Sequence, residues 1–503
     1  MNTRLAGAQL GRKATTPGHR WWPLLALLAV AVLLVASAGC GGTSPETQSP
    51  PLQPTETATA TPCPSHPPTF VPTPSPTSTA TPLPTSTPVP TPSPSPTATP
   101  TALPIPLSPR ERAALEAIAD EVEQIRGLDS NAPLALAFMT PEEMHGWLIE
   151  QLAQEYSPEE AGRDARLYVA LELLPPETDL YALTLALYAE QIAGFYDNDR
   201  NQMTVIDDET GLDAMDKLTF AHEYTHDLQD QFLGLDNLQA YREAADSNED
   251  TVRAITALVE GDAQTITMLY LLNHMDELDL SALETIETAT FDAAPLILQE
   301  ELTFPYLAGM TFVQTIRQQG GWDAVNALYD APPQSTEQIL HPAKYLAAEA
   351  PLAVSLPPLT GTLGAGWHLV KENTLGEFLL HHYLDVHLPG SVAGDASAGW
   401  GGDRFALYEQ PSTGDTLLLL VTAWDDQAQA AEFASAYAAF AEDKHNSPAT
   451  AQDPSATWWH SNNQATLLLT TGHHITILLG PDTETLQRVR QTVEKELPPN
   501  PNH

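Results

Sequence analysis

The sequence predicts a mainly α-helical domain with a small edge sheet, followed by a smaller α+β domain. Apolar residues recur at helical spacing through most of residues 107–358. One alternating run at residues 194–209 interrupts this periodicity and predicts two strands joined by a turn. From about residue 359 strand-like runs alternate with helical ones, which is typical of an α+β domain with an antiparallel sheet. We expect this second domain to span residues 359–498.

The first forty residues have the pattern of an export signal. Four basic residues precede an apolar run at residues 21–38, and small residues then lead to Cys40. The ending SAGC resembles the lipobox of bacterial lipoproteins, in which the cysteine is acylated and becomes the new N-terminus. The apolar run is also long enough to remain as a single membrane span. Either interpretation anchors residues 1–40 at a membrane and places the rest of the chain on its outer face.

Residues 41–106 consist almost entirely of Pro, Thr, Ser and Ala, without a single Lys or Arg. Such a segment lacks the apolar surface that folding requires and samples extended polyproline II conformations. We predict a disordered stalk that holds the folded part away from the membrane. The whole chain has 65 acidic and 21 basic residues, a formal net charge of −44. This balance argues against nucleic acid or an anionic lipid surface as a partner.

Capping residues mark the first helices of the helical domain. Ser108 and Thr140 each precede a proline and stand three residues before a glutamate, which is a helix N-terminal pattern. Segment 331–345 is predicted to be a loop. Later helices are expected at residues 213–233, with Gly234 as the stop, and at 248–273, 304–320 and 321–330.

In the second domain, strands are expected at residues 404–409, 416–424, 464–471 and 474–480, and helices at 426–443 and 483–497. His381, His382 and His387 precede this sheet. We interpret them as surface or interior histidines, because they lack a carboxylate partner at ligand spacing.

The helix expected at 213–233 contains His222, Glu223 and His226 within the segment HEYTH. Positions i and i+4 of a helix lie one above the other, so the two imidazoles can hold one ion. Glu223 projects from the neighbouring edge, where it can hydrogen-bond a water on that ion. This is the His-Glu-x-x-His arrangement of zinc proteases. Both cysteines lie before residue 107, so histidines and carboxylates must hold any metal in the folded part.

The next helix supplies a third candidate ligand, Glu260, within the segment ALVEGDA. A His-Glu-x-x-His helix followed by a glutamate on a partner helix resembles the gluzincin branch of metallopeptidases, to which thermolysin belongs. The segments EQIAGFYDNDRNQMTVI, FPYLAGMTF, GGW and STEQILHPAKY extend the likeness to a group of exported bacterial metallopeptidases. The likeness covers about residues 110–350.

This resemblance implies a zincin-like fold with one Zn²⁺ ion held by the two histidines and Glu260. It also implies that Glu223 is the general base, acting on a metal-activated water. The chain departs from the thermolysin pattern at Gln264, where an aspartate is expected to orient the first histidine. Asp262 lies two residues after Glu260 and is an alternative direct ligand.

The resemblance further implies a later Tyr or His that donates to the oxyanion of the tetrahedral intermediate. The candidates are His341, in the LHP segment, and Tyr306, in FPY; a loop histidine and a packing aromatic are equally good interpretations. The strand at residues 203–206 is expected to be an edge strand that pairs with an extended substrate backbone.

These features predict a zinc-dependent peptidase on the outer face of a bacterial cell membrane, with a peptide or protein as substrate. The alternative is a non-catalytic surface lipoprotein that binds a metal or a partner and keeps a vestigial peptidase fold. The intact Glu223 favours the catalytic interpretation, because a structural metal site has no use for a general base.

Overall fold

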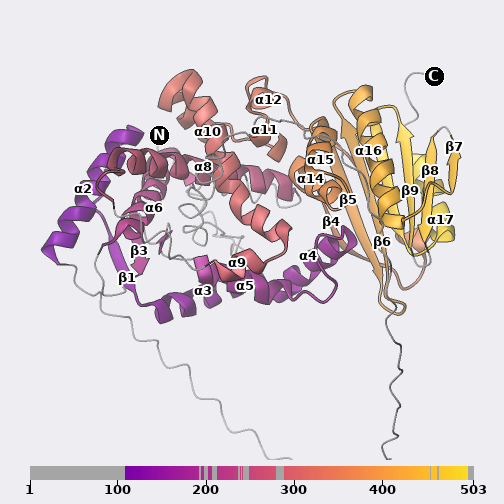
Figure 1. Ribbon diagram of the computed structural model, residues 1–503, viewed down its shortest axis with the longest axis horizontal. Coiled ribbons are helices and arrows are strands. Elements are labelled where there is room, and N and C mark those ends of the chain that lie inside the picture. The colour runs from indigo at the N-terminus through magenta and orange to yellow at the C-terminus, as the bar shows by residue number, and fades with distance from the viewer. Residues whose placement is uncertain are drawn as a thin grey trace, which may run out of the picture. The chain divides into compact units, whose positions relative to one another are not determined.

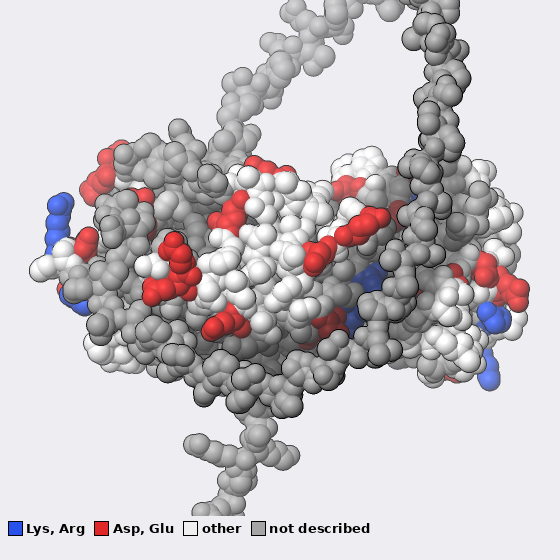
Figure 2. Space-filling view, turned by 90° about the horizontal axis from the view of Figure 1, so that it is seen from below, with Lys and Arg blue, Asp and Glu red and all other residues white. Residues whose placement is uncertain are grey.

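The computed structural model describes residues 108–496, apart from 192–193, 198–201, 207–211, 236–237, 239–240, 242–247, 279–287, 454 and 462–463. The predicted signal at 1–40, with Cys40, and the predicted stalk at 41–106 lie outside these residues. Among the helices of the described residues, none combines the length and the apolar character that crossing a membrane requires. Figure 2 shows one face of the molecule, on which acidic side chains are scattered and basic ones are fewer.

The first part of the chain is mainly helical, and a small sheet lies beside helix α6 (Figure 1). Its elements in chain order are α2 (Pro109–Arg126), β1 (Leu136–Met139), α3 (Pro141–Glu155), α4 (Pro158–Ala170), α5 (Leu180–Gln191), β2 (Gly194–Asp197), β3 (Gln202–Ile206), α6 (Ala214–Leu233), α8 (Glu249–His274), α9 (Ala289–Ala293), α10 (Leu296–Asp330), α11 (Thr336–Leu340) and α12 (Pro342–Leu346).

Capping boxes begin several of these helices. Ser108 accepts a hydrogen bond from the backbone N–H of Glu111, whose side chain bonds back to the Ser108 backbone, and this confirms the start predicted for α2. Thr140 does the same for α3. Helix α6 begins with an equivalent pair, Asp213 and Asp216, which the sequence prediction did not identify.

The small sheet has the strand order β1-β3-β2. Met203 of β3 lies beside Leu136 of the parallel strand β1 and beside Tyr196 of the antiparallel strand β2. The prediction of an edge strand at residues 203–206 is therefore wrong, since both sides of β3 are paired within the described part of the chain. The pairing with β1 is long-range, so the local pattern of β3 could not indicate it. Strands β1 and β2 are the outer strands of this order, and β2 contacts α6.

Helices α8 and α10 cross at two glycines. A Cβ atom on Gly261 would lie 2.1 Å from the carbonyl carbon of Gly309, so any side chain there would overlap the facing backbone. Helix α10 also contains a break at Gly321, whose φ is 68°. The helices predicted at 304–320 and 321–330 are thus the two halves of one kinked element.

The loop predicted at residues 331–345 is in part helical. It contains α11 and α12, which are five residues each and are separated by His341. Ser335 caps α11 by accepting a hydrogen bond from the backbone N–H of Gln338. Helices this short contain too few residues for an apolar period to appear in the sequence.

The rest of the described chain contains a seven-stranded sheet with the order β4-β5-β6-β10-β9-β8-β7, in which neighbours are antiparallel. Its elements are α13 (Thr360–Leu363), β4 (His368–Asn373), α14 (Gly376–Asp385), α15 (Gly390–Ser397), β5 (Trp400–Gln410), β6 (Asp415–Trp424), α16 (Gln427–His445), β7 (Ala451–Asp453), β8 (Ala456–Ser461), β9 (Gln464–Thr471), β10 (His474–Gly480) and α17 (Thr483–Glu496).

Strand β6 contributes to a core on each face of this sheet. Leu418 and Leu420 belong to the same cluster as Phe433 of α16, while Leu417 belongs to the cluster that contains Leu486 of α17. Side chains alternate between the two faces of the sheet along β6, and both faces are therefore buried. The four strands and two helices predicted here are present, and β4, β7 and β8 were not predicted.

The hydrophobic core does not divide at residue 358. One buried cluster joins Phe304 of α10 to Phe378 of α14 and continues to Trp424 of β6. The described residues between 108 and 496 belong to one compact unit. The boundary between residues 358 and 359 separates two kinds of secondary structure, but both share this core.

Candidate metal centre

The HEYTH segment lies in the buried middle of α6. The helix begins at its Asp213 cap and ends at Gly234, which has a left-handed φ of 74° as predicted for a stop residue. His222, Glu223 and His226 are all buried. Buried polar groups require partners, and the facing helix α8 supplies one for the two histidines.

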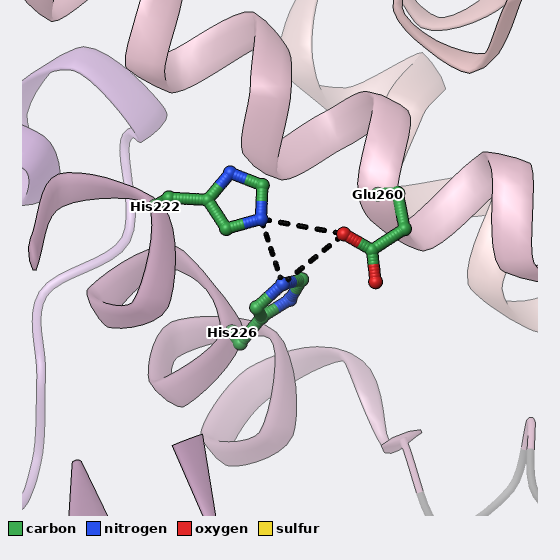
Figure 3. A group of neighbouring side chains, drawn as sticks. All are labelled: His222, His226 and Glu260. Carbon is green, nitrogen blue, oxygen red and sulfur yellow. Dashed lines mark hydrogen bonds and ion pairs between the residues drawn. The ribbon is translucent and has the colours of Figure 1, made fainter. Parts of the chain in front are cut away.

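Glu260 of α8 points toward the two histidines of α6, as Figure 3 shows. Its Oε2 atom lies 3.3 Å from His222 Nε2 and 3.5 Å from His226 Nε2, and the two nitrogens are 3.2 Å apart. A tetrahedral zinc ion with bonds of 2.0–2.1 Å spaces its ligand atoms by about 3.3–3.4 Å. The triangle formed by these three atoms therefore matches one face of a zinc coordination shell.

The second nitrogen of each imidazole has its own partner. Gln229 Oε1 lies 2.8 Å from His226 Nδ1, and Thr267 Oγ1 lies 3.4 Å from His222 Nδ1. Thr267 donates its own hydroxyl proton to the Ala263 carbonyl at 2.9 Å, so it accepts from the histidine. Each Nδ1 thus donates a hydrogen bond, and each Nε2 is the nitrogen that faces Glu260 and would bind a metal.

Asp262 is not directed at this centre. Arg126 of α2 donates to its two oxygens at 3.1 and 3.0 Å, and the Tyr329 hydroxyl donates at 2.8 Å. Gln229 Nε2 also lies 3.4 Å from Asp262, which thereby touches the residue that orients His226. Of the two ligands considered from the sequence, Glu260 is the one grouped with the histidines.

Glu223 lies beside the triangle with one oxygen unengaged. Its Oε1 atom is buried and has no hydrogen-bond partner among the described residues. Burial raises its pKa above the ordinary value, although the two histidines and a hydrogen bond from the Tyr196 backbone of β2 oppose the shift. A carboxylate of raised pKa with a free lone pair beside a metal-ligand group is suited to accept a proton.

The charges of Glu260 and His226 depend on each other. Burial alone would raise the pKa of Glu260, but the charge of His226 and contacts with both imidazoles lower it to about 2. Burial would lower the pKa of His226, whereas Glu260 and Glu223 raise it to about 9. A proton thus balances the buried carboxylate, and a divalent cation would take its place.

The two oxyanion candidates lie in different surroundings. Tyr306 of α10 is fully buried, and its ring centroid is 6.0 Å from that of His222. Burial, then the charges of Glu260 and Glu223, raise the pKa of Tyr306 above its ordinary value. His341 instead pairs with Glu377 of α14 at 2.8 Å, and no contact among the described residues joins it to the metal-ligand group.

Sequence reasoning did not identify the residues that hold the histidines. Gln229 was detectable, because it lies three residues after His226 on the same helix and faces the same side. Thr267 and Arg126 come from other helices, and no local pattern links them to HEYTH.

Residues 367–490 match the model of a protein family described as Domain of unknown function (DUF8575). The match lies within the region of the seven-stranded sheet and does not reach α6 or α8. Neither the curated proteins nor the solved structures contain a match to this chain.

Proposed function

We propose that this chain is a zinc-dependent peptidase of the gluzincin type, tethered to the outer face of a bacterial cell membrane. One observation carries the proposal: two imidazole nitrogens and one carboxylate oxygen are 3.2–3.5 Å apart, with Glu223 beside them. Three nitrogen and oxygen ligands with a fourth position open are the donor set of catalytic zinc.

Zinc held by His222, His226 and Glu260 would supply a Lewis acid that lowers the pKa of water toward about 7. Glu223 has its unengaged oxygen next to this group, so it would take a proton from the attacking water and pass it to the departing amine. Tyr306, on the neighbouring helix α10, is the better placed of the two candidates to donate to the oxyanion. His341 is held by Glu377 and has no part in the proposed chemistry.

The membrane tether rests on the sequence of residues 1–40, either through acylation of Cys40 or through a single span. The peptide or protein substrate would meet the folded part beyond the stalk at 41–106.

The test combines metal analysis with peptide cleavage by the full chain in detergent. Glu223→Gln is expected to keep zinc and lose cleavage by at least about 100-fold, because only the proton carrier is removed. His222→Ala and Glu260→Ala are expected to lose the zinc as well. A wild-type chain that holds zinc but cleaves nothing in an unbiased peptide library would instead support the non-catalytic alternative.

A further inference from the structure

A second group of metal-ligand side chains lies on α14, outside the centre described above. His381, His382 and Asp385 each offer one nitrogen or oxygen atom, and these atoms lie within 4.8 Å of one another. His381 and Asp385 are one helical turn apart, the spacing that places His222 above His226. The interpretation that these histidines lack a carboxylate at ligand spacing is wrong for His381 and His382, because Asp385 provides one.

The polar atoms of this group have few competing partners. Within the described residues, no hydrogen bond or ion pair engages the side chains of His381, His382 or Asp385. Their ligand atoms are therefore not occupied by another protein group. The nearby Arg253 does not oppose a cation strongly, since it forms an ion pair with Glu301 at 2.7 Å.

We propose that His381, His382 and Asp385 bind a second divalent metal ion of the zinc type. Imidazoles and a carboxylate are ligands that zinc accepts.

The ion would be held by α14 alone, within the region matched at residues 367–490. It would act independently of His222, His226 and Glu260, because the two groups share no side chain.

The experiment counts the zinc ions bound per full chain, purified in detergent and dialysed against zinc. The wild type is expected to bind two ions, and the His381→Gln, Asp385→Asn double variant one. His226→Ala should also bind one, and zinc should still raise its thermal midpoint because the second site remains. His387→Gln is the control, because His387 hydrogen-bonds Glu172 and Asp443 instead of this group. This variant should still bind two ions.

If the double variant does not fold, Asp385→Asn alone is expected to weaken the second binding step by at least about tenfold. The proposal is overturned if the folded double variant binds as many ions as the wild type. That outcome does not bear on the peptidase, which is judged by peptide cleavage and by the zinc lost in His222→Ala.

Discussion

At the scale of single residues, the orientation of His226 depends on a side chain outside the HEYTH segment. Gln229 accepts from His226 Nδ1 with its oxygen and donates to the Val259 carbonyl with its nitrogen at 3.1 Å. Because both ends of the amide are used, its flip state is determined. Asp262 lies behind Gln229 Nε2, so the buried Asp262–Arg126 pair supports the imidazole through one intervening residue.

The replacement Gln229→Leu tests this support. It keeps a similar volume but removes the acceptor for Nδ1–H, which leaves the imidazole free to rotate and to change tautomer. We expect zinc affinity to fall by about 10- to 100-fold, as for other residues that orient metal-bound histidines. The measurement is competition with a chelator of known zinc affinity.

Gln231→Leu is the matched control for Gln229→Leu. It removes another amide from the same helix, but its partners are Ser130, Asn131 and Asp227, none of which belongs to the metal centre. Equal zinc affinities for the two variants would show that Gln229 does not orient His226.

At the scale of helices, the position of Glu260 is set by the crossing of α8 and α10. Gly261 follows Glu260 directly, and a Cβ atom there would meet the backbone of Gly309 at 2.1–2.6 Å. A Cβ on Gly309 would in turn lie 2.0 Å from the Ala257 carbonyl oxygen. The two backbones are thus in contact, and the crossing fixes how far Glu260 reaches toward α6.

Gly261→Ala is therefore expected to push the two helices apart. Overpacking of this kind costs about 1–3 kcal/mol of unfolding free energy, and the shift of Glu260 should also weaken zinc binding. Gly162→Ala is the control: Gly162 lies in α4 with nothing within 4 Å of an added Cβ. It should be neutral or stabilising by up to about 1 kcal/mol, since alanine favours a helix. Urea unfolding of both variants distinguishes these outcomes, and similar midpoints would contradict the tight crossing.

The sequence predicted the elements that local chemistry determines. The starts of α2 and α3, the end of α6 at Gly234 and the four longer strands of the large sheet follow from capping residues and alternation. Local pattern could not give the parallel pairing of β1 with β3, which joins distant segments. Nor could it give α11 and α12, which are too short to show a period.

The sequence likewise predicted one part of the candidate metal centre and could not predict another. The spacing of His222 and His226 is a property of one helix and could be predicted. That Glu260, rather than Asp262, turns toward them depends on the rotation of α8 against α6 and α10. The sequence left these two carboxylates as alternatives, and the packing of Gly261 and Arg126 separates them.

At the scale of the whole chain, the predicted attachment to the membrane has two versions that Cys40 distinguishes. If Cys40 is acylated, the mature chain begins there and incorporates a labelled fatty acid, and Cys40→Ser accumulates as an unlabelled precursor. If residues 21–38 remain as a span, wild type and Cys40→Ser have the same mass and neither is labelled. Mass spectrometry of the intact N-terminus, together with fatty-acid labelling, distinguishes acylation of Cys40 from a retained span. We expect the first result, because SAGC resembles a lipobox.

Two buried carboxylates, Asp250 and Asp403, lie near the junction of the two parts of the compact unit, where the Phe378 N–H donates to the Thr336 hydroxyl oxygen at 3.2 Å. Asp250 of α8 accepts hydrogen bonds from the hydroxyl of Thr336 at 2.5 Å and from its backbone N–H at 3.1 Å. Asp403 of β5 accepts from the backbone N–H groups of Leu375 and Gly376, both at 2.9 Å. Burial raises the pKa of Asp250 to about 7 and that of Asp403 to about 6, although these hydrogen bonds oppose the shift.

A raised carboxyl pKa makes the folded chain bind a proton that the unfolded chain has already released. Stability from Asp250 is then fully present below the unfolded pKa of 3.8 and is lost as the pH rises through about 7. Between pH 8.5 and pH 6, acidification should raise the unfolding free energy through this group by about 1 kcal/mol. Asp250→Asn removes this titrating group, so the unfolding free energy should change less with pH. The expectation holds even if the substitution lowers the stability at every pH. Urea unfolding across this range, with zinc present so that the metal ligands do not titrate, measures both slopes. Parallel slopes for wild type and Asp250→Asn would mean that Asp250 stays ionised in the folded chain.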